Sequence, residues 1–408
     1  MARRFGAIAV LLGLVGVGCG TAPSADRALD GVLYVATSSG LAAVDAASGA
    51  ERVALDGAIP TPDWAEAYVA RPAGDDTLVE RVSLANDGKV LAERSVAGDL
   101  RVSVASQGTL VALTEPRSPG ATPWLPDGRA RSRLVIADLS GEERTRSFEL
   151  EGNFEPEAFS TNERELFMIE YVPAMDPDRY RVRRLKLDSG AVVDIGPFKL
   201  AAPDEMRGTG RMQVFAPDGA RLYTLYTRQG LNYAHGETAG GSGHVNAFVH
   251  VLDLHGRWAH CVDLPEPFGS GSSTASAIAL ARDGRSLYVA DWTNGAIAQV
   301  GTKRLKVLAS KRLRLGGPDD STFATTGPDG RVYVAGNSQV AVVDGTTLEE
   351  IDRFELGTEV AGLVVSEDGS TLYAGTPSGV AVVDARTGAR LGYLSVPGSL
   401  GVTALAHP

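Results

Sequence analysis

The sequence predicts an all-β protein, an eight-bladed β-propeller made of four-stranded antiparallel blades. Three observations support this fold class. Short runs of Val, Leu, Ala and Tyr alternate with Asp-Gly, Ser-Gly and Thr-Gly pairs along the chain. A four-strand unit recurs every few dozen residues, and the two ends of the chain resemble the two halves of one unit. Repeats of this length are the signature of a propeller.

The clearest unit covers residues 358–397. It predicts a strand VAGLVVS, a turn at Asp368-Gly369, a strand TLYAG, a strand GVAVVD, a turn at Thr387-Gly388, and a last strand ARLGYLSV. We name these strands a to d from the inside of the blade outwards. Asp-Gly and Thr-Gly pairs suit the turns because their residues tolerate the positive φ angles that hairpins require.

The same pattern recurs towards the N-terminus. Its further a–b turns are predicted at Asp329-Gly330, Asp283-Gly284, Asp218-Gly219, Asn162-Glu163, Gln107-Gly108 and Asp63-Trp64. The last three turns are degenerate, so a seven-bladed ring is the alternative to an eight-bladed one.

The two ends of the chain complete each other. Residues 30–55 supply strands b, c and d without a strand a, whereas GVTALAHP at 401–408 is a strand a that nothing follows. Joined, they give ALAHP-DGVLYVAT, which matches APDGARLYTLY elsewhere in the chain. We therefore expect one domain, residues 30–408, in which the last strand completes the first blade and removes an open sheet edge.

Residues 1–19 have the features of a signal peptide. Arg3 and Arg4 precede an apolar stretch that is too short to span a bilayer. Cys19 follows small residues, and this arrangement resembles a bacterial lipoprotein signal, although Gly16 departs from the usual pattern. The resemblance implies a protein lipid-anchored through Cys19 to the bacterial cell membrane, facing outside the cytoplasm, with residues 20–29 as a flexible tether. Secretion as a soluble protein is the alternative.

The charge and motif content narrow the function. The net charge of −11, without a concentrated basic patch, argues against a nucleic-acid partner. The sequence has no GxSxG, P-loop or GxGxxG motif, and four Trp residues are too few for the docking motif of quinone-dependent propellers. We therefore expect no cofactor, a monomer, and a binding or scaffold module rather than an enzyme.

The repeats, such as DGRSLYVADWTNGAIAQV and VVSEDGSTLYAG, resemble bacterial YVTN-type (YncE-like) propellers, with some likeness to NHL repeats. The resemblance covers nearly all of residues 30–408. Such propellers include binding scaffolds, electron-transfer subunits and lactonase-like enzymes, so the resemblance implies the fold and leaves the activity open. A lactonase-like hydrolase, with a metal or an acid/base group in the channel, is the alternative function.

Propeller connectivity predicts where a ligand binds. The a–b and c–d turns lie on one face, here called the turn face, and the b–c and d–a connections lie on the other, the loop face. The longest connections are all on the loop face: 115–131, 171–179 and 227–245 join b to c, while 198–209 and 265–274 join d to a. Loops on a rigid scaffold carry most binding residues, so we expect the site at the loop-face mouth of the channel.

Aromatic and polar residues near that mouth are the ligand-binding candidates: Trp124, Tyr171, Tyr226, Arg228, Asn232, Tyr233, Asp291 and Trp292. Aromatic rings with a few polar partners suit a protein, peptide or glycan ligand. His235, His244 and Glu237 have side chains that could bind zinc. Because the chain has no HxH, HExxH or CxxC motif, ordinary loop histidines are the favoured interpretation.

Overall fold

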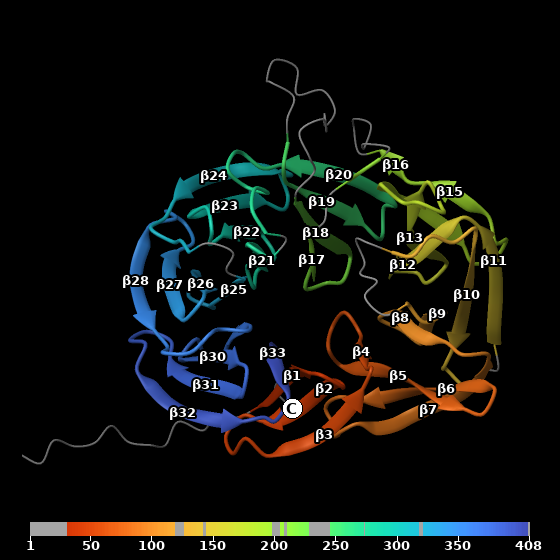
Figure 1. Cartoon of the computed structure of the whole chain (residues 1–408), viewed down its shortest axis with the longest axis horizontal. Helices are drawn as coiled ribbons and strands as arrows, with labels where there is room; N and C mark the ends of the chain where they lie inside the picture. The colour runs from red at the N-terminus through yellow and green to blue at the C-terminus, as the bar shows by residue number, and fades with distance from the viewer. Residues whose placement is uncertain are drawn as a thin grey trace, which may run out of the picture.

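Strands arranged as radial sheets surround a central axis in the computed structural model (Figure 1). The structure describes residues 31–118, 126–141, 144–197, 205–207, 210–227, 245–272, 274–317 and 321–406. Within these residues the strands form eight antiparallel blades, so the eight-bladed prediction is confirmed and the seven-bladed alternative is wrong. In the same residues, no helix is long and apolar enough to span a membrane.

The first four blades follow the predicted order from the inside outwards. Blade 1 contains β33 (Ser399–Ala406), β1 (Val32–Thr37), β2 (Gly40–Asp45) and β3 (Glu51–Asp56). Blade 2 contains β4 (Ile59–Pro60), β5 (Glu66–Ala73), β6 (Asp76–Ser83) and β7 (Lys89–Ala97). Blade 3 contains β8 (Arg101–Ala105), β9 (Leu110–Thr114), β10 (Arg131–Asp138) and β11 (Arg144–Glu151). Blade 4 contains β12 (Asn153–Phe159), β13 (Glu165–Val172), β14 (Arg179–Lys186) and β15 (Val192–Asp194).

The second half repeats this plan with one addition. Blade 5 contains β17 (Gly210–Phe215), β18 (Arg221–Thr227), β19 (Phe248–Asp253) and β20 (Trp258–Asp263), and the short β16 (Gly196–Pro197) pairs in parallel with β20. Blade 6 contains β21 (Ser276–Leu280), β22 (Ser286–Asp291), β23 (Ala296–Gly301) and β24 (Lys306–Arg312). Blade 7 contains β25 (Thr322–Thr326), β26 (Arg331–Gly336), β27 (Gln339–Asp344) and β28 (Glu350–Glu355). Blade 8 contains β29 (Leu363–Val365), β30 (Thr371–Thr376), β31 (Gly379–Asp384) and β32 (Arg390–Ser395).

The C-terminal strand closes the ring. β33 pairs antiparallel with β1 from Ala406 opposite Val32 to Ser399 opposite Thr37. Val402 of β33 packs in one apolar cluster with Leu33 of blade 1 and Tyr373 of blade 8. The predicted joint between the two ends of the chain is therefore confirmed, and it connects the first blade to the last.

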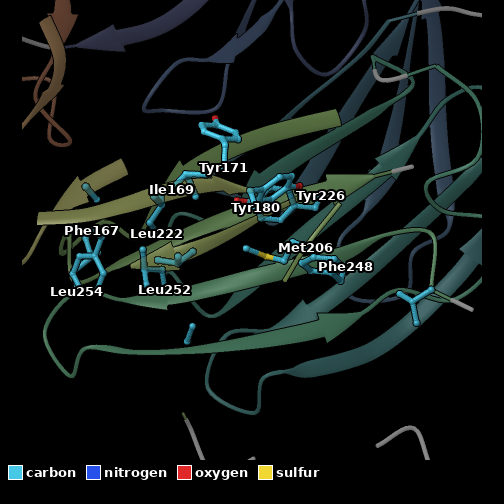
Figure 2. Packing of buried hydrophobic residues seen from close by; sticks show 14 residues of the cluster. Phe167, Ile169, Tyr171, Tyr180, Met206, Leu222, Tyr226, Phe248, Leu252 and Leu254 are labelled. Atoms are coloured by element: carbon cyan, nitrogen blue, oxygen red, sulfur yellow. The ribbon is translucent and has the colours of Figure 1, made fainter. Parts of the chain in front are cut away.

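The hydrophobic core lies between neighbouring blades rather than at one centre. Both faces of strand b are covered by neighbouring blades, so β30 of blade 8 is buried at all six positions and its sequence is a continuous run instead of an alternating pattern. Between blades 4 and 5, aromatic side chains from both sheets interdigitate (Figure 2). Each blade is thus held by packing against two neighbours.

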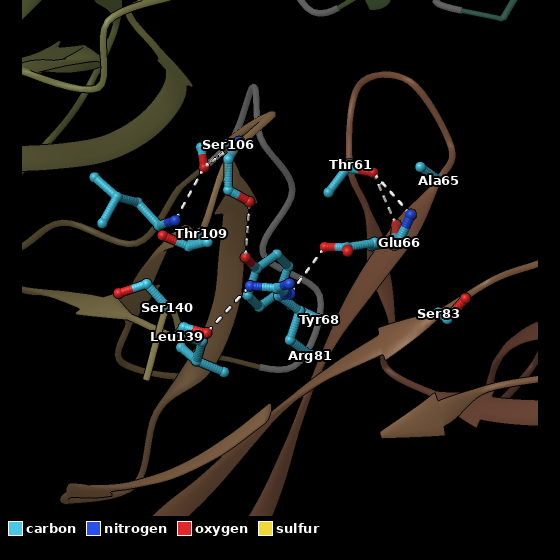
Figure 3. A network of polar contacts seen from close by, with 12 residues as sticks. Thr61, Ala65, Glu66, Tyr68, Arg81, Ser83, Ser106, Thr109, Leu139 and Ser140 are labelled. Atoms are coloured by element: carbon cyan, nitrogen blue, oxygen red, sulfur yellow. Dashed lines mark hydrogen bonds and ion pairs between the residues drawn. The ribbon is translucent and has the colours of Figure 1, made fainter. Parts of the chain in front are cut away.

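Polar contacts add to this packing at the blade junctions. The Tyr of the repeated strand b donates a hydrogen bond from its hydroxyl to the next blade. Tyr34 donates to the carbonyl of Leu84 at 3.2 Å, and Tyr288 donates to the carbonyl of Gly345 at 3.0 Å. Figure 3 shows a related junction, in which Arg81 of blade 2 pairs with Glu66 at 3.0 Å and donates to the Leu139 carbonyl of blade 3 at 3.1 Å. These bonds give the recurrent Tyr a structural role.

Candidate loop-face site

The loop-face mouth between blades 3 and 4 is built from two inner strands and two b–c connections. Strand a of each blade enters from the loop face, so Arg101 at the start of β8 and Glu155 near the start of β12 both lie near this mouth. Residues 115–118 and 126–130 of blade 3, together with 173–178 of blade 4, belong to the connections above them.

A buried carboxylate organises this mouth. The Glu155 side chain is only 4% exposed, and its Oε2 lies 2.7 Å from Nη2 of Arg101 and 3.6 Å from Nη2 of Arg117. Its Oε1 accepts a hydrogen bond from Nη2 of Arg129. Burying a carboxylate costs several kcal/mol unless cations and hydrogen bonds compensate it. Here three guanidiniums surround one carboxylate.

Asn153, the fully buried first residue of β12, fixes the loops around this cluster. Its Nδ2 donates to the carbonyl of Asp127 at 2.8 Å and to that of Ala174 at 3.2 Å. Its Oδ1 accepts from Nε of Arg129 at 3.0 Å. One amide therefore ties the b–c connections of blades 3 and 4 to the inner strand and sets the position of Arg129.

The charges in this cluster do not balance. Burial lowers the pKa of the Arg101 guanidinium, Glu155 raises it, and Arg117 and Arg129 lower it again. Nε of Arg101 is buried without a hydrogen-bond acceptor in the described part of the chain. The next carboxylate along this loop, Asp127, accepts the backbone N–H of Ser118 at 3.1 Å.

Two of the predicted ligand-binding residues, Tyr171 and Tyr226, lie in the core between blades 4 and 5 (Figure 2). They are 2% and 1% exposed. The rings of Tyr171 and Tyr180 have centroids 6.2 Å apart, and Tyr226 lies 5.3 Å from both Tyr180 and Phe248. Burial is the main cause that raises the pKa of Tyr171. Tyr226 has the surroundings of a packing residue. Tyr171 is also packed, but it lies near Glu155, Arg117 and Arg129, whose charges affect its pKa. Contact of either tyrosine with a ligand stays a prediction.

Asp291 and Trp292 lie together at the loop-face end of blade 6, and both are buried. Oδ1 of Asp291 accepts the backbone N–H of Asn294 at 2.8 Å, which closes the b–c turn. Burial raises the pKa of Asp291, and the hydrogen bonds from Asn294 lower it. The Trp292 ring packs against Gly336 of blade 7, and the guanidinium of Arg353 lies 5.9 Å from its centroid. This pair stabilises a turn and a blade junction.

The other predicted site residues lie outside the described residues. These are Trp124, Arg228, Asn232, Tyr233, His235, Glu237, His244 and the lipidation candidate Cys19. Among the residues that are described, no group of three or more His, Cys, Asp or Glu side chains is placed to hold a metal ion. The zinc and lipidation hypotheses therefore stay predictions.

The turn face also has cavities, although its connections are short. A cavity of about 350 Å³ is lined by the a–b turns of blades 3, 4 and 5, including Ser106, Ser160 and Glu163. Two others, of about 560 and 490 Å³, lie between blades 3 and 4 and between blades 5 and 6. Ser106 and Ser160 use their hydroxyl oxygens within the turns, accepting the N–H groups of Leu110 and Glu165 at 3.0 Å.

The arginine cluster is the feature that sequence reasoning missed. Arg101, Arg117, Arg129 and Glu155 come from two strands and two ends of a long connection, and no local spacing links them. The available signal was the pair of arginines at either end of segment 115–131, together with a glutamate in the first half of an inner strand.

Comparison with known proteins supports the architecture. No protein-family model matches the chain, and a search of curated proteins gives no significant match. Among solved structures, apo AztD from Citrobacter koseri is 12% identical with a TM-score of 0.56, over 92% of this chain and 97% of that one. A second crystal structure of Citrobacter koseri AztD is also 12% identical, with a TM-score of 0.54, over 92% of this chain and 96% of that one. The dihydro-heme d1 dehydrogenase NirN in complex with DHE is 14% identical with a TM-score of 0.52, over 93% of this chain and 75% of that one.

These likenesses show the fold alone. At 12% to 14% identity they carry no activity or ligand over to this chain. The β-propeller itself is supported both by the sheet topology and by its solved neighbours.

Proposed function

We propose that this protein is an exported, lipid-anchored propeller of the YVTN type that binds a protein, peptide or glycan ligand at the cell envelope through its loop face. The lipoprotein-like segment ending at Cys19 supports the location. The observation that carries the binding site is the arginine cluster around Glu155 at the loop-face mouth, in which Asn153 and Glu155 fix Arg129. A charged group held on a rigid scaffold is ready to bind without a further ordering cost.

Two exposed apolar side chains lie on the same face. Of the large apolar side chains exposed in the described residues, five lie on the outermost strands: Val90, Leu91, Leu308, Ile351 and Leu391. The other two, Met175 and Leu400, lie at the loop-face ends of blades 4 and 1. The Met175 carbonyl packs against Gly128, so this methionine belongs to the loop pair that covers the arginine cluster. Exposed apolar groups beside fixed charges suit a binding surface.

Photo-crosslinking tests the binding face. A benzophenone amino acid replaces Met175 on the loop face, and a matched variant replaces Gln107, which is exposed on the turn face. In cells that express the full chain, we expect a discrete crosslinked species from position 175 and none from position 107. Crosslinks from position 107 alone, or from neither position, would contradict a loop-face ligand.

Membrane partitioning tests the anchor separately. We expect wild-type protein to sediment with membranes and Cys19→Ser to stay in the soluble fraction. A wild-type protein that stays soluble would contradict lipid anchoring and would favour the secreted alternative, without bearing on the ligand face.

A further inference from the structure

We infer that the loop-face cluster of Arg101, Arg117, Arg129 and Glu155 is a binding site for an oxyanion, a carboxylate or phosphate group of the ligand. The inference rests on the proposed function for the identity of the face and adds the chemistry that the face recognises.

The first argument is charge. Three guanidiniums and one carboxylate leave two positive charges uncompensated within the cluster, in a chain whose net charge is −11. The blade 3 connection also carries Glu115, which is exposed, and Asp127, which accepts the N–H of Ser118. Within the described residues neither carboxylate pairs with these arginines, and residues 119–125 contain no ionisable side chain. Like charges held a few ångströms apart and partly out of water repel each other, and screening by salt reduces this less than it does at an open surface. An anion from outside relieves that repulsion.

The second argument is hydrogen-bonding capacity. Each guanidinium has five N–H donors. Arg129 is oriented by Asn153 and Glu155, and it serves as the fixed support of the cluster. Arg117 makes no hydrogen bond within the described residues, since its contact with Glu155 is a 3.6 Å ion pair. Nε of Arg101 likewise has no acceptor there. Carboxylates and phosphates match the guanidinium fork with two parallel hydrogen bonds.

The third argument is that a structural role alone does not need this number of arginines. Arg101 and Arg129 each donate a hydrogen bond to a different oxygen of Glu155, which satisfies the buried carboxylate. Arg117 adds a third positive charge that lowers the pKa of Arg101 further. The Arg117 side chain is 30% exposed, so it can reach a ligand that arrives from solvent. Glu155 fixes the geometry, and the exposed Arg117 supplies free donors to solvent, while the free Nε of Arg101 is buried.

Isothermal titration calorimetry on the purified full chain tests the inference. The probes are citrate for carboxylates, inorganic phosphate for phosphates, and glucose as a neutral control, all at low ionic strength. We expect wild type to bind at least one anion, with affinity that falls as sodium chloride is added. The anion that binds with the higher affinity indicates whether the site prefers a carboxylate or a phosphate group. Arg117→Gln should weaken binding about tenfold or more, as expected when a charged hydrogen-bond donor is removed.

Arg131→Gln is the matched control, because Arg131 lies on the same face of blade 3 but pairs with Glu151 at the exposed outside of the blade. We expect its affinity for the anion to match that of wild type. Arg117→Lys keeps the charge without the fork and should bind between wild type and Arg117→Gln. Circular dichroism melting establishes that each variant is folded.

Two results would overturn the oxyanion site: no binding of either anion by wild type, or equal affinities for Arg117→Gln and Arg131→Gln. Continued crosslinking from position 175 in either case would leave the loop-face ligand intact and reject only its anionic character. Loss of crosslinking with anion binding retained would reject the proposed function instead.

Discussion

The hydroxyl of Thr403 donates a 2.9 Å hydrogen bond to the backbone carbonyl of Tyr34, a residue 369 positions earlier in the chain. The bond lies where the pairing of β33 with β1 shifts register between Tyr34 and Val35. It belongs to the one blade that is assembled from both ends of the chain. The stability of the ring therefore depends on its last strand.

Ending the chain at Gly398 removes that strand, and we expect a loss of most of the folding free energy. An ordinary domain is stable by about 5–15 kcal/mol, whereas the deletion exposes an edge of β1 and uncovers the cluster around Leu33 and Tyr373. Thr403→Val, which removes only the hydroxyl, should cost about 1 kcal/mol. Urea unfolding of the wild type, Thr403→Val and the truncated chain should show stability falling in that order. A truncated chain as stable as the full one would reject closure by β33.

The repeat and its closure could be predicted from sequence because they depend on local chemistry. Asp-Gly pairs specify the tight turns, and Gly219, Gly284, Gly330 and Gly369 all have positive φ. In two of the degenerate turns a residue other than glycine has the positive φ: Trp64 in one and Glu163 in the other. Their strands were still recognisable by apolar runs, which is why the blade count was correct.

The candidate site was harder to predict because a blade is covered on both faces. The strand positions of Tyr171 and Tyr226 could face a ligand or a neighbouring blade, and only the assembled ring places them in the core. Arg101 and Glu155 meet because β8 and β12 are adjacent inner strands, a relationship that no spacing in the sequence contains.

Gly336→Ala tests the junction between blades 6 and 7. A Cβ at this position would lie 2.3 Å from the Trp292 ring, and the indole is itself buried between the blades. We expect a loss of about 1–3 kcal/mol in the free energy of unfolding, typical of overpacking. Gly392→Ala is the control, because its nearest contact is Val382 at 4.0 Å. Equal melting of both variants would contradict this packing.

Asp344 should stabilise the c–d turn of blade 7 in a pH-dependent way. Its Oδ1 accepts the N–H groups of Thr347 at 2.7 Å and Thr346 at 3.0 Å, and these bonds hold its pKa below the ordinary value of 3.8. A lowered folded-state pKa means that the stabilisation is present above pH 3.8 and is lost as the pH falls below it. Asp344→Ala should therefore cost about 1 kcal/mol at pH 7.

The comparison with Asp344→Asn isolates the charge. The amide oxygen can still accept from Thr347, so this variant should lose less than Asp344→Ala at pH 7. The stability gap between wild type and each variant, measured by urea unfolding, should narrow as the pH is lowered towards 3. A gap that stays constant over this range would show that the ionised carboxylate is not the stabilising group.

Tyr226→Ala distinguishes a packing role from ligand contact. The Tyr226 ring lies 5.3 Å from Tyr180 and from Phe248 and is 1% exposed, so truncation leaves a cavity between blades 4 and 5. We expect a loss of about 3–5 kcal/mol, as for other buried aromatic residues. Leu391→Ala, at a position 51% exposed on β32, should change stability by no more than about 0.5 kcal/mol. Tyr226 packs against Tyr180 and Phe248 and is not one of the arginine donors, although Tyr171 of the same cluster lies near Arg117. The folded Tyr226→Ala protein should therefore keep its affinity for the anion in calorimetry. Unchanged stability together with weakened binding would instead assign Tyr226 to the ligand.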